Sequence, residues 1–270
     1  MEMDFGARSD VGCVRENNED SYRVAAEMNL FVLSDGMGGL DCGEVASRIA
    51  VDTILEHCRL GDTNPAIPLA GGRIDGVSET TNRLASAVRI ANSMVHQAAQ
   101  NSVSGRGMGA TVAAIRLKSE RMSIAHVGDS RVYRLRGEEL EQLTRDHSFV
   151  AEEMRQGRMS AQEADRSGLH NVLVRALGVE PEVDVDASEE LVLESDTILL
   201  CSDGLTRELS DEQIAAVLRE TDDAQEATEQ LIELAKQAGG GDNVTAIVVH
   251  PVARPVGALG KISKWLKDTV

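Results

Sequence analysis

The sequence predicts an α+β fold, in which helices and antiparallel strands occupy different stretches of the chain. Apolar residues recur at helical spacing in long segments such as 79–101, whereas 110–136 consists of short β-rich runs separated by turns. Such short turns join antiparallel runs, because a parallel crossover needs a dozen residues or more. The order of these segments therefore favours α+β over a doubly wound sheet.

The elements can be predicted in order along the chain. Strands are expected over 21–25, 30–34, 110–117, 122–127, 131–136, 197–202 and 244–250. Helices are expected over 44–58, 79–101, 149–156, 160–167, 210–219 and 223–238. Prolines and glycines predict a long surface loop over 59–78. Ser210 is the expected N-cap of its helix, with Asp211 and Glu212 in the first turn, where acids suit the helix dipole.

Composition sets the broad class of the protein. The 270 residues are 42% hydrophobic but only 2% aromatic, so the core has to be built mainly from aliphatic side chains. The net charge of −18 disfavours a nucleic-acid partner, which would require a basic face. No apolar run approaches the roughly 18 residues of a transmembrane helix, and the N-terminus lacks signal-peptide features. The four cysteines lack metal or disulfide spacing, which indicates free thiols in the cytoplasm.

Aspartates next to glycine or asparagine recur at the ends of apolar runs. They are Asp20, Asp35, Asp129, Asp203 and Asp242. One such residue is commonly a turn former, but five brought together by folding would repel one another. Mg²⁺ or Mn²⁺ would remove this conflict, since both prefer oxygen ligands. A glycine after the aspartate, such as Gly36, would let the backbone turn and approach an ion closely.

Eight motifs in a fixed order identify a family resemblance. They are GCVRENNEDS, LSDGMGG, GMGATV, AHVGDSRVYRLR, LTRDHS, NVLVRALG, LLCSDGL and GGGDNVT, which lie between residues 4 and 249. Together they resemble the metal-dependent serine/threonine protein phosphatases of type 2C (PPM), in their bacterial form. The resemblance implies a four-layer α-β-β-α sandwich of two antiparallel sheets flanked by helices. It also implies a catalytic domain over 1–252, with a flap at about 148–175 and a binuclear metal site at one end.

The resemblance assigns the ligands of these metals. Asp35 would bridge two ions, and the carbonyl of Gly36 would bind one of them. Asp203 and Asp242 would hold the other ion, while Asp20 would act mainly through bound water. These positions are all present in the sequence.

Further roles follow from the same resemblance. Asp129, together with Asp203, would hold a third metal. Glu19 and Asn243 would orient waters in the second shell. Arg15 would clamp the phosphate, because a guanidinium fork matches phosphate oxygens.

The implied reaction is hydrolysis of phosphoserine and phosphothreonine monoesters. A water or hydroxide that bridges two divalent metals would attack phosphorus directly, so no phosphoenzyme would form. The cofactors would be two or three Mg²⁺ or Mn²⁺ ions per chain. Ser34, Ser130 and Ser202 are then expected to be structural hydroxyls. Met37 stands where eukaryotic relatives commonly have a histidine proposed as the general acid, which leaves the identity of this acid open.

Two other functions remain to be weighed. A catalytically silent phosphatase fold could serve as a regulatory or binding module, although every metal-binding aspartate and Arg15 are present. A two-metal nuclease is disfavoured by the acidic balance. The expected partners are phosphoproteins, including a cognate Ser/Thr kinase and its substrates, and the expected state is a monomer. His126 and His147 are expected to serve structure.

The C-terminal segment 253–270 is predicted to be an amphipathic basic helix. At helical spacing its apolar face comprises Leu259, Ile262, Trp265 and Leu266, and its basic face Lys261, Lys264 and Lys267. Such a helix could dock on the parent domain, bind a partner or contact anionic lipid.

Overall fold

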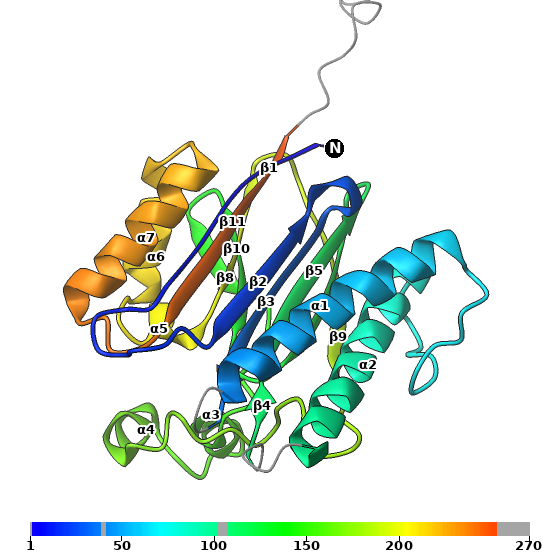
Figure 1. The fold of residues 1–270 in the computed structure, drawn as a ribbon. Helices are drawn as coiled ribbons and strands as arrows, with labels where there is room; N and C mark the ends of the chain where they lie inside the picture. The colour runs from blue at the N-terminus through cyan, green and yellow to red at the C-terminus, as the bar shows by residue number, and fades with distance from the viewer. Residues whose placement is uncertain (1, 39–41, 102–106, 253–270) are drawn as a thin grey trace, which may run out of the picture.

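The computed structural model describes residues 2–38, 42–101 and 107–252, and it shows two antiparallel sheets packed face to face (Figure 1). The first sheet has the strand order β1 (Glu2–Asp10), β11 (Val244–Val252), β10 (Asp196–Cys201), β7 (Arg131–Arg136) and β8 (Glu139–Gln142). The second sheet has the order β2 (Asp20–Ala25), β3 (Leu30–Met37), β5 (Val112–Lys118), β6 (Arg121–Val127) and β9 (Asp186–Leu191), and the short β4 (Gly109–Ala110) pairs with β3.

Helices cover the outer face of each sheet. The second sheet is covered by α1 (Cys42–Thr63) and α2 (Glu79–Asn101), and the first by α6 (Asp211–Glu220) and α7 (Ala224–Ala238) (Figure 1). Three short helices, α3 (Phe149–Arg155), α4 (Ala161–Ser167) and α5 (Asp203–Thr206), lie toward one end of the sandwich, and a 3₁₀ turn spans Ala26–Met28. The predicted α-β-β-α sandwich is therefore confirmed.

Three apolar layers hold these four layers of secondary structure together. One lies between the two sheets, and the others lie beneath α1 and α2 and beneath α6 and α7. The apolar run of strand β3 is continuous because both faces of the strand are buried. Leu30 and Val32 belong to the layer beneath α1 and α2, whereas Phe31 and Leu33 belong to the layer between the sheets. Successive side chains point to opposite faces of a strand, so a strand buried on both faces needs apolar residues throughout.

Most predicted elements are present, with shifted ends. Helix α2 and strand β7 begin and end as predicted, and Ser210 caps α6 through a capping box with Gln213. Helix α1 continues to Thr63, beyond its predicted end. Three strands were not predicted, namely β1, β8 and β9. They lie at the edges of the two sheets, and their burial is mostly partial, so they carry only a weak apolar pattern.

The strands predicted over 110–117, 122–127 and 131–136 were expected to be antiparallel neighbours in this order. This expectation is correct for the first two strands but not for the third. Strands β5 and β6 form an antiparallel hairpin, but β7 lies in the other sheet. The intervening turn carries the chain from one sheet to the other, and Gly128 adopts a φ of +105° there. A Cβ at Gly128 would lie 2.6 Å from Cβ of Thr111. Sequence spacing limits how far a short turn can reach, but it does not distinguish a hairpin from a crossing between packed sheets.

The proposed domain boundary falls at the end of β11. Strand β11 ends at Val252, and the predicted amphipathic helix at 253–270 lies outside the described residues. Among the residues that the structure describes, no helix is both long enough and apolar enough to cross a membrane.

Candidate metal centre

Strand pairing brings the first two predicted aspartates together. Asp20 begins β2 and Asp35 lies near the end of β3, and the two residues are direct partners in the antiparallel register. Asp20 is buried, whereas Asp35 is partly exposed in a cavity. Directly opposite residues in antiparallel strands lie close together, so their carboxylates interact strongly.

The first sheet supplies two more aspartates at the same end of the sandwich. Asp203 begins α5, two residues after the end of β10, and Asp242 comes two residues before the start of β11. Since β10 and β11 are antiparallel neighbours, the end of one strand meets the start of the other. Two adjacent strands therefore place both acids near the pair from the second sheet.

Asp129 reaches this end by a different route. It lies in the turn that crosses from β6 to β7, and it is buried. The neighbouring Ser130 shares a 2.6 Å hydrogen bond with Thr111, whose own amide donates to the carbonyl of Asp35. The crossing thus lies against the metal-site end of β3.

A cavity of about 210 Å³ collects the predicted residues. Its lining includes Arg15, Glu19, Asp35, Gly36, Asp129, Asp203, Asp242 and Asn243. Asp20 is the exception, because it is buried behind this surface. The structure therefore brings together residues that are dispersed over more than 220 positions of the chain, and it adds Arg207, Asn171 and Met37 to them.

Two buried oxygen atoms in this cluster lack a hydrogen-bond partner. Among the described residues, Oδ1 of Asp20 and Oδ1 of Asp203 are buried and accept no hydrogen bond. A buried polar atom without a partner is costly, and a carboxylate oxygen is a preferred ligand of hard cations. The donor set consists of oxygen atoms, so the residues present fit Mg²⁺ or Mn²⁺.

Burial and mutual repulsion raise the pKa values of several acids in this cluster. Burial raises the pKa of Asp20 to about 7, and the charges of Asp203 and Asp242 add to this effect. Burial likewise raises the pKa of Asp129 to about 7, with the charge of Asp203 as the next cause. The pKa of Asp35 is raised well above its ordinary value by desolvation and by the charge of Asp20. Bound cations would stabilise the ionised form of every one of these acids.

The glycines of the two Ser-Asp-Gly motifs both pack closely against neighbouring backbone. A Cβ at Gly36 would lie 2.0 Å from the carbonyl oxygen of Gly43 in α1, and one at Gly204 would lie 2.0 Å from the carbonyl oxygen of Asn243. Strand β3 continues through Gly36 to Met37. The prediction of a sharp turn after Asp35 is therefore wrong, because the strand passes beneath α1 without bending away. No side chain larger than hydrogen fits at either glycine.

Arg15 lies on the loop that precedes β2, close to one of the aspartates. Its guanidinium donates to Oδ2 of Asp242 at 3.0 Å, and its side chain is about half exposed. The buried Asn243 holds this loop in place. Its amide nitrogen donates to the carbonyls of Val11 and Asn17, and its Oδ1 accepts from the backbone N–H of Glu19. Asn243 therefore positions the backbone around Arg15.

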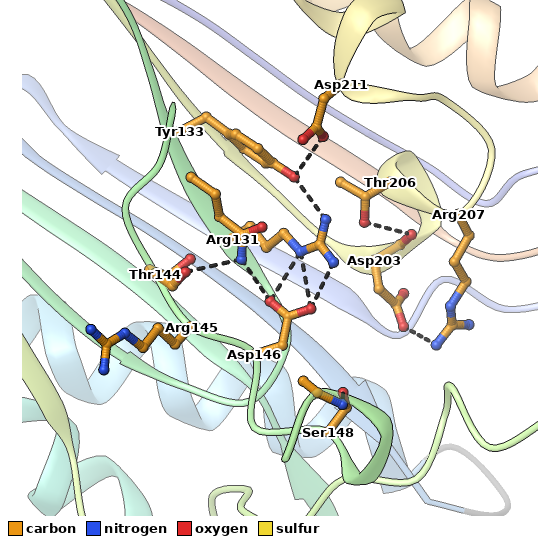
Figure 2. Close-up of polar contacts among 12 residues, drawn as sticks. Arg131, Tyr133, Thr144, Arg145, Asp146, Ser148, Asp203, Thr206, Arg207 and Asp211 are labelled. Atoms are coloured by element: carbon orange, nitrogen blue, oxygen red, sulfur yellow. Dashed lines mark hydrogen bonds and ion pairs between the residues drawn. The ribbon is translucent and has the colours of Figure 1, made fainter. Parts of the chain in front are cut away.

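Arg207 is a site residue that the sequence analysis missed. Its guanidinium pairs with Asp203 one helical turn earlier (Figure 2), and it also donates to Oδ2 of Asp242 at 3.1 Å. The spacing of four residues from Asp203 within a helix was the available signal, since residues i and i+4 are neighbours on a helix surface. The short helix α5 was not predicted, so this signal was not used.

Hydrogen bonds fix the second oxygen of Asp20. Oδ2 of Asp20 accepts from Oγ of Ser202 at 2.8 Å and from Oγ1 of Thr245 at 2.6 Å. Ser202 thus orients a carboxylate, which agrees with the structural role expected for it. Thr245 was not predicted to have this role, although it is the last residue of the GGGDNVT motif.

A second cluster joins the two histidines that the sequence analysis expected to serve structure. The ligating atoms of His126, His147 and Asp186 lie within 4.8 Å of one another, and the histidine rings stack with centroids 4.7 Å apart. A guanidinium nitrogen of Arg175 lies 2.5 Å from Asp186 and 3.2 Å from Nε2 of His147. Arg175 therefore supplies the positive charge that balances Asp186 in this cluster. His147 also accepts from the backbone N–H of Gly128, which links the cluster to the Asp129 crossing.

Comparison with known proteins agrees with this geometry. Residues 14–239 match the family model described as protein phosphatase 2C. The protein phosphatase PhpP of Streptococcus pneumoniae is 33% identical over 250 residues, which cover 92% of this chain and 97% of that protein. The crystal structure of the Mycobacterium tuberculosis serine/threonine phosphatase PstP/Ppp has 36% identity and a TM-score of 0.81, and the match covers 94% of this chain and all of that one. The catalytic domain of PstP in complex with two manganese ions has 38% identity and a TM-score of 0.79, with coverage of 93% and 99%.

The fold and the acidic centre define a metal-dependent phosphatase that acts on phosphorylated proteins. This chain belongs to the protein phosphatase 2C family. The predicted activity of a serine/threonine protein phosphatase is thereby confirmed.

Proposed function

We propose that this chain hydrolyses phosphoserine and phosphothreonine by direct attack of water on phosphorus at a centre of two divalent cations. The buried, partnerless oxygens of Asp20 and Asp203 are the observation that carries this proposal. A solved relative in complex with two manganese ions supports the number of ions. Mn²⁺ is the proposed resident metal, and Mg²⁺ is an alternative with the same ligand preference.

Each acid has a specific part in holding these cations. Asp35 is the strand partner of Asp20 and shares the cavity with Asp203 and Asp242, so it would be the shared ligand, together with the carbonyl of Gly36. Asp203 and Asp242 would complete the site from the first sheet, and Asp20 would contribute from behind through ordered water. Asp129 would join Asp203 at a third, weaker site, with its position in the crossing turn as support.

When bound, two such ions activate the attacking water and neutralise charge on the phosphoryl oxygens. The chain's own residues orient the substrate. Arg15 presents a half-exposed guanidinium at the cavity mouth, where it can donate to phosphoryl oxygens, and Asn243 keeps its loop in position. Glu19, whose backbone Asn243 also binds, would orient water beside the acids.

The setting of this activity is proposed from the chain's other properties. All four cysteines are free, and three of them are buried, which suits a reducing compartment such as the cytoplasm. We place the enzyme there as a monomer that acts on phosphoproteins and opposes a Ser/Thr kinase. A catalytically silent module is the alternative, and it is disfavoured because Arg15 and every predicted metal-binding aspartate are present.

Hydrolysis of an aryl phosphate tests the proposal directly. The wild-type protein should turn over the substrate with Mn²⁺, and either a chelator or Asp35→Asn should lower kcat/KM at least 1000-fold, since the shared ligand is lost. The exposed Asp52 on α1 provides a matched control, and Asp52→Asn should retain full activity. Activity that survives the chelator would contradict the metal mechanism. A wild-type protein that binds Mn²⁺ but hydrolyses neither aryl phosphate nor phosphopeptides would instead indicate the silent module.

A further inference from the structure

A second and larger cavity, of about 580 Å³, adjoins the metal centre. It is enclosed by α3, α4, α5 and the segment around Asn171. The two cavities share four lining residues, namely Asp129, Asn171, Asp203 and Arg207. A substrate whose phosphoryl group enters the metal cavity therefore has its neighbouring residues beside this larger space. Its volume lies within the range of about 300–1,000 Å³ that is typical of ligand pockets.

One wall of this flanking cavity is apolar. Helices α3 and α4 contribute Val150, Ala151, Met154, Ala161 and Ala164. Val150 and Ala164 are buried, which fixes the wall, whereas the side chain of Met154 is 43% exposed. A methionine thioether adapts its shape to different apolar partners at low cost. An exposed, flexible apolar residue in a wall of small ones provides a surface for another apolar group.

Arg131, Asp146, Asp203 and Arg207 also line this cavity, and these charged side chains already have partners. The guanidinium of Arg131 makes three contacts of 2.7–3.1 Å with Asp146 and donates to the hydroxyl of Tyr133 at 2.7 Å (Figure 2). Arg207 pairs with Asp203 (Figure 2). Paired charges offer little net attraction to a further ion, so apolar burial is the larger interaction available in this space.

We propose that the flanking cavity binds an apolar side chain located within two residues of the phosphorylated serine or threonine, and that Met154 determines this specificity. The inference rests on the proposed function, because it requires the phosphoryl group to occupy the metal cavity. It adds a substrate class, namely phosphoproteins with a leucine-like residue beside the phosphorylation site. Burial of one such side chain supplies enough free energy for at least tenfold discrimination.

Phosphothreonine heptapeptides test this selectivity. The peptides carry leucine, glycine, lysine or aspartate at one of the first two positions on either side of the phosphothreonine, with one varied position in each of four sets. With Mn²⁺ enzyme, kcat/KM for the leucine peptide of one set should exceed that for its glycine and aspartate counterparts at least tenfold. Aryl phosphate hydrolysis, measured in parallel, reports the metal centre alone. Equal kcat/KM for all peptides would overturn the subsite while leaving the phosphatase activity standing, and loss of aryl phosphate hydrolysis would instead refute the proposed function.

Two variants assign the selectivity to the cavity. Met154→Glu should reduce the leucine-over-glycine ratio to near one and favour the lysine peptide. The matched control is Met94→Glu, because Met94 is 45% exposed on α2 and is not among the residues that line the flanking cavity. This control should keep the wild-type ratio. Ala161→Phe, which narrows the cavity from an exposed position at the start of α4, should also lower the ratio. A preference for lysine in the wild-type enzyme, or the same ratio in Met154→Glu and Met94→Glu, would overturn the proposal.

Discussion

The two oxygen atoms of the Asp20 carboxylate are in opposite situations. Oδ2 accepts two short hydrogen bonds from Ser202 and Thr245, whereas Oδ1 is buried and has no hydrogen-bond partner among the residues that the structure describes. The hydrogen bonds hold the carboxylate in one orientation. Oδ1 is then available to bind a cation or a water molecule of its coordination shell. Thr245 lies in β11, and Ser202 directly follows the last residue of β10. Side chains of the first sheet therefore orient an acid of the second sheet.

Replacing Thr245 by valine tests this orienting role. Thr245→Val keeps the shape of the side chain but removes one hydrogen bond to Asp20, so Mn²⁺ affinity measured by calorimetric titration should fall about 10- to 100-fold. The control is Thr228→Val, since Thr228 is an equally buried threonine that donates to a helix carbonyl in α7. Both variants lose a buried hydroxyl, but only the first should alter metal binding. Equal affinities in the two variants would refute the orienting role.

The edge strand β9 shows how one carboxylate can join separate elements. Glu189 accepts hydrogen bonds from the backbone N–H of Ser78 at 2.7 Å and from the hydroxyl of Thr81, and it pairs with Arg121 of β6 at 2.5 Å. These contacts connect the start of α2 to the edge of the second sheet. A strand with a weak apolar pattern is thereby held by polar contacts as well as by its backbone ladder with β6.

The stability of the protein should depend on Glu189 in a pH-dependent way. Burial alone would raise the pKa of Glu189, but hydrogen bonds from Ser78 and Thr81 and the Arg121 contact outweigh it and lower the pKa from 4.5 to about 2. A depressed carboxyl pKa stabilises the fold above the unfolded value of 4.5, and this stabilisation is lost as the pH falls toward 2. Glu189→Gln should therefore cost about 1–3 kcal/mol of unfolding free energy at pH 7 in urea titrations, and this cost should shrink steadily below pH 4.5. The control is Glu182→Gln at an exposed position, which should lower the unfolding free energy by less than about 0.5 kcal/mol at either pH. If the loss of unfolding free energy in Glu189→Gln does not change with pH, this explanation is wrong.

The predictability of each element follows from how much of its stability is local. Helix α2 was predicted to the residue, because its apolar stripe, 23-residue length and flanking loops all agree. Strands β1 and β9 were missed, because their stability comes from long-range pairing with β11 and β6. Arg207 was missed because the short helix that places it beside Asp203 was not predicted and its other partner, Asp242, is 35 positions away. Sequence motifs predicted the five clustered aspartates and the neighbouring Asn243, but not Arg207, which pairs with Asp203 and Asp242.

The metal centre also connects the two halves of the sandwich. Asp20 and Asp35 belong to one sheet, whereas Asp203 and Asp242 lie at the ends of strands in the other. In the absence of cations these acids repel one another, and burial disfavours their ionised forms. Cations that bind all four would therefore stabilise the packing of the two sheets as well as the site itself. Ligand binding to the folded state raises its stability by mass action.

Thermal unfolding should report this connection. At a Mn²⁺ concentration about 100 times the dissociation constant, the gain is about 2.7 kcal/mol per site, which corresponds to a Tm increase of roughly 5–10 °C for a chain of this size. Asp203→Asn removes a ligand of the first sheet and should abolish most of this increase, although it should raise the Tm of the metal-free protein because one repelling charge is gone. Asp52→Asn, on the outer surface of α1, should preserve the full increase. If Mn²⁺ binds with the expected affinity but leaves the Tm unchanged, the ions do not hold the sheets together, and the centre is catalytic without being structural.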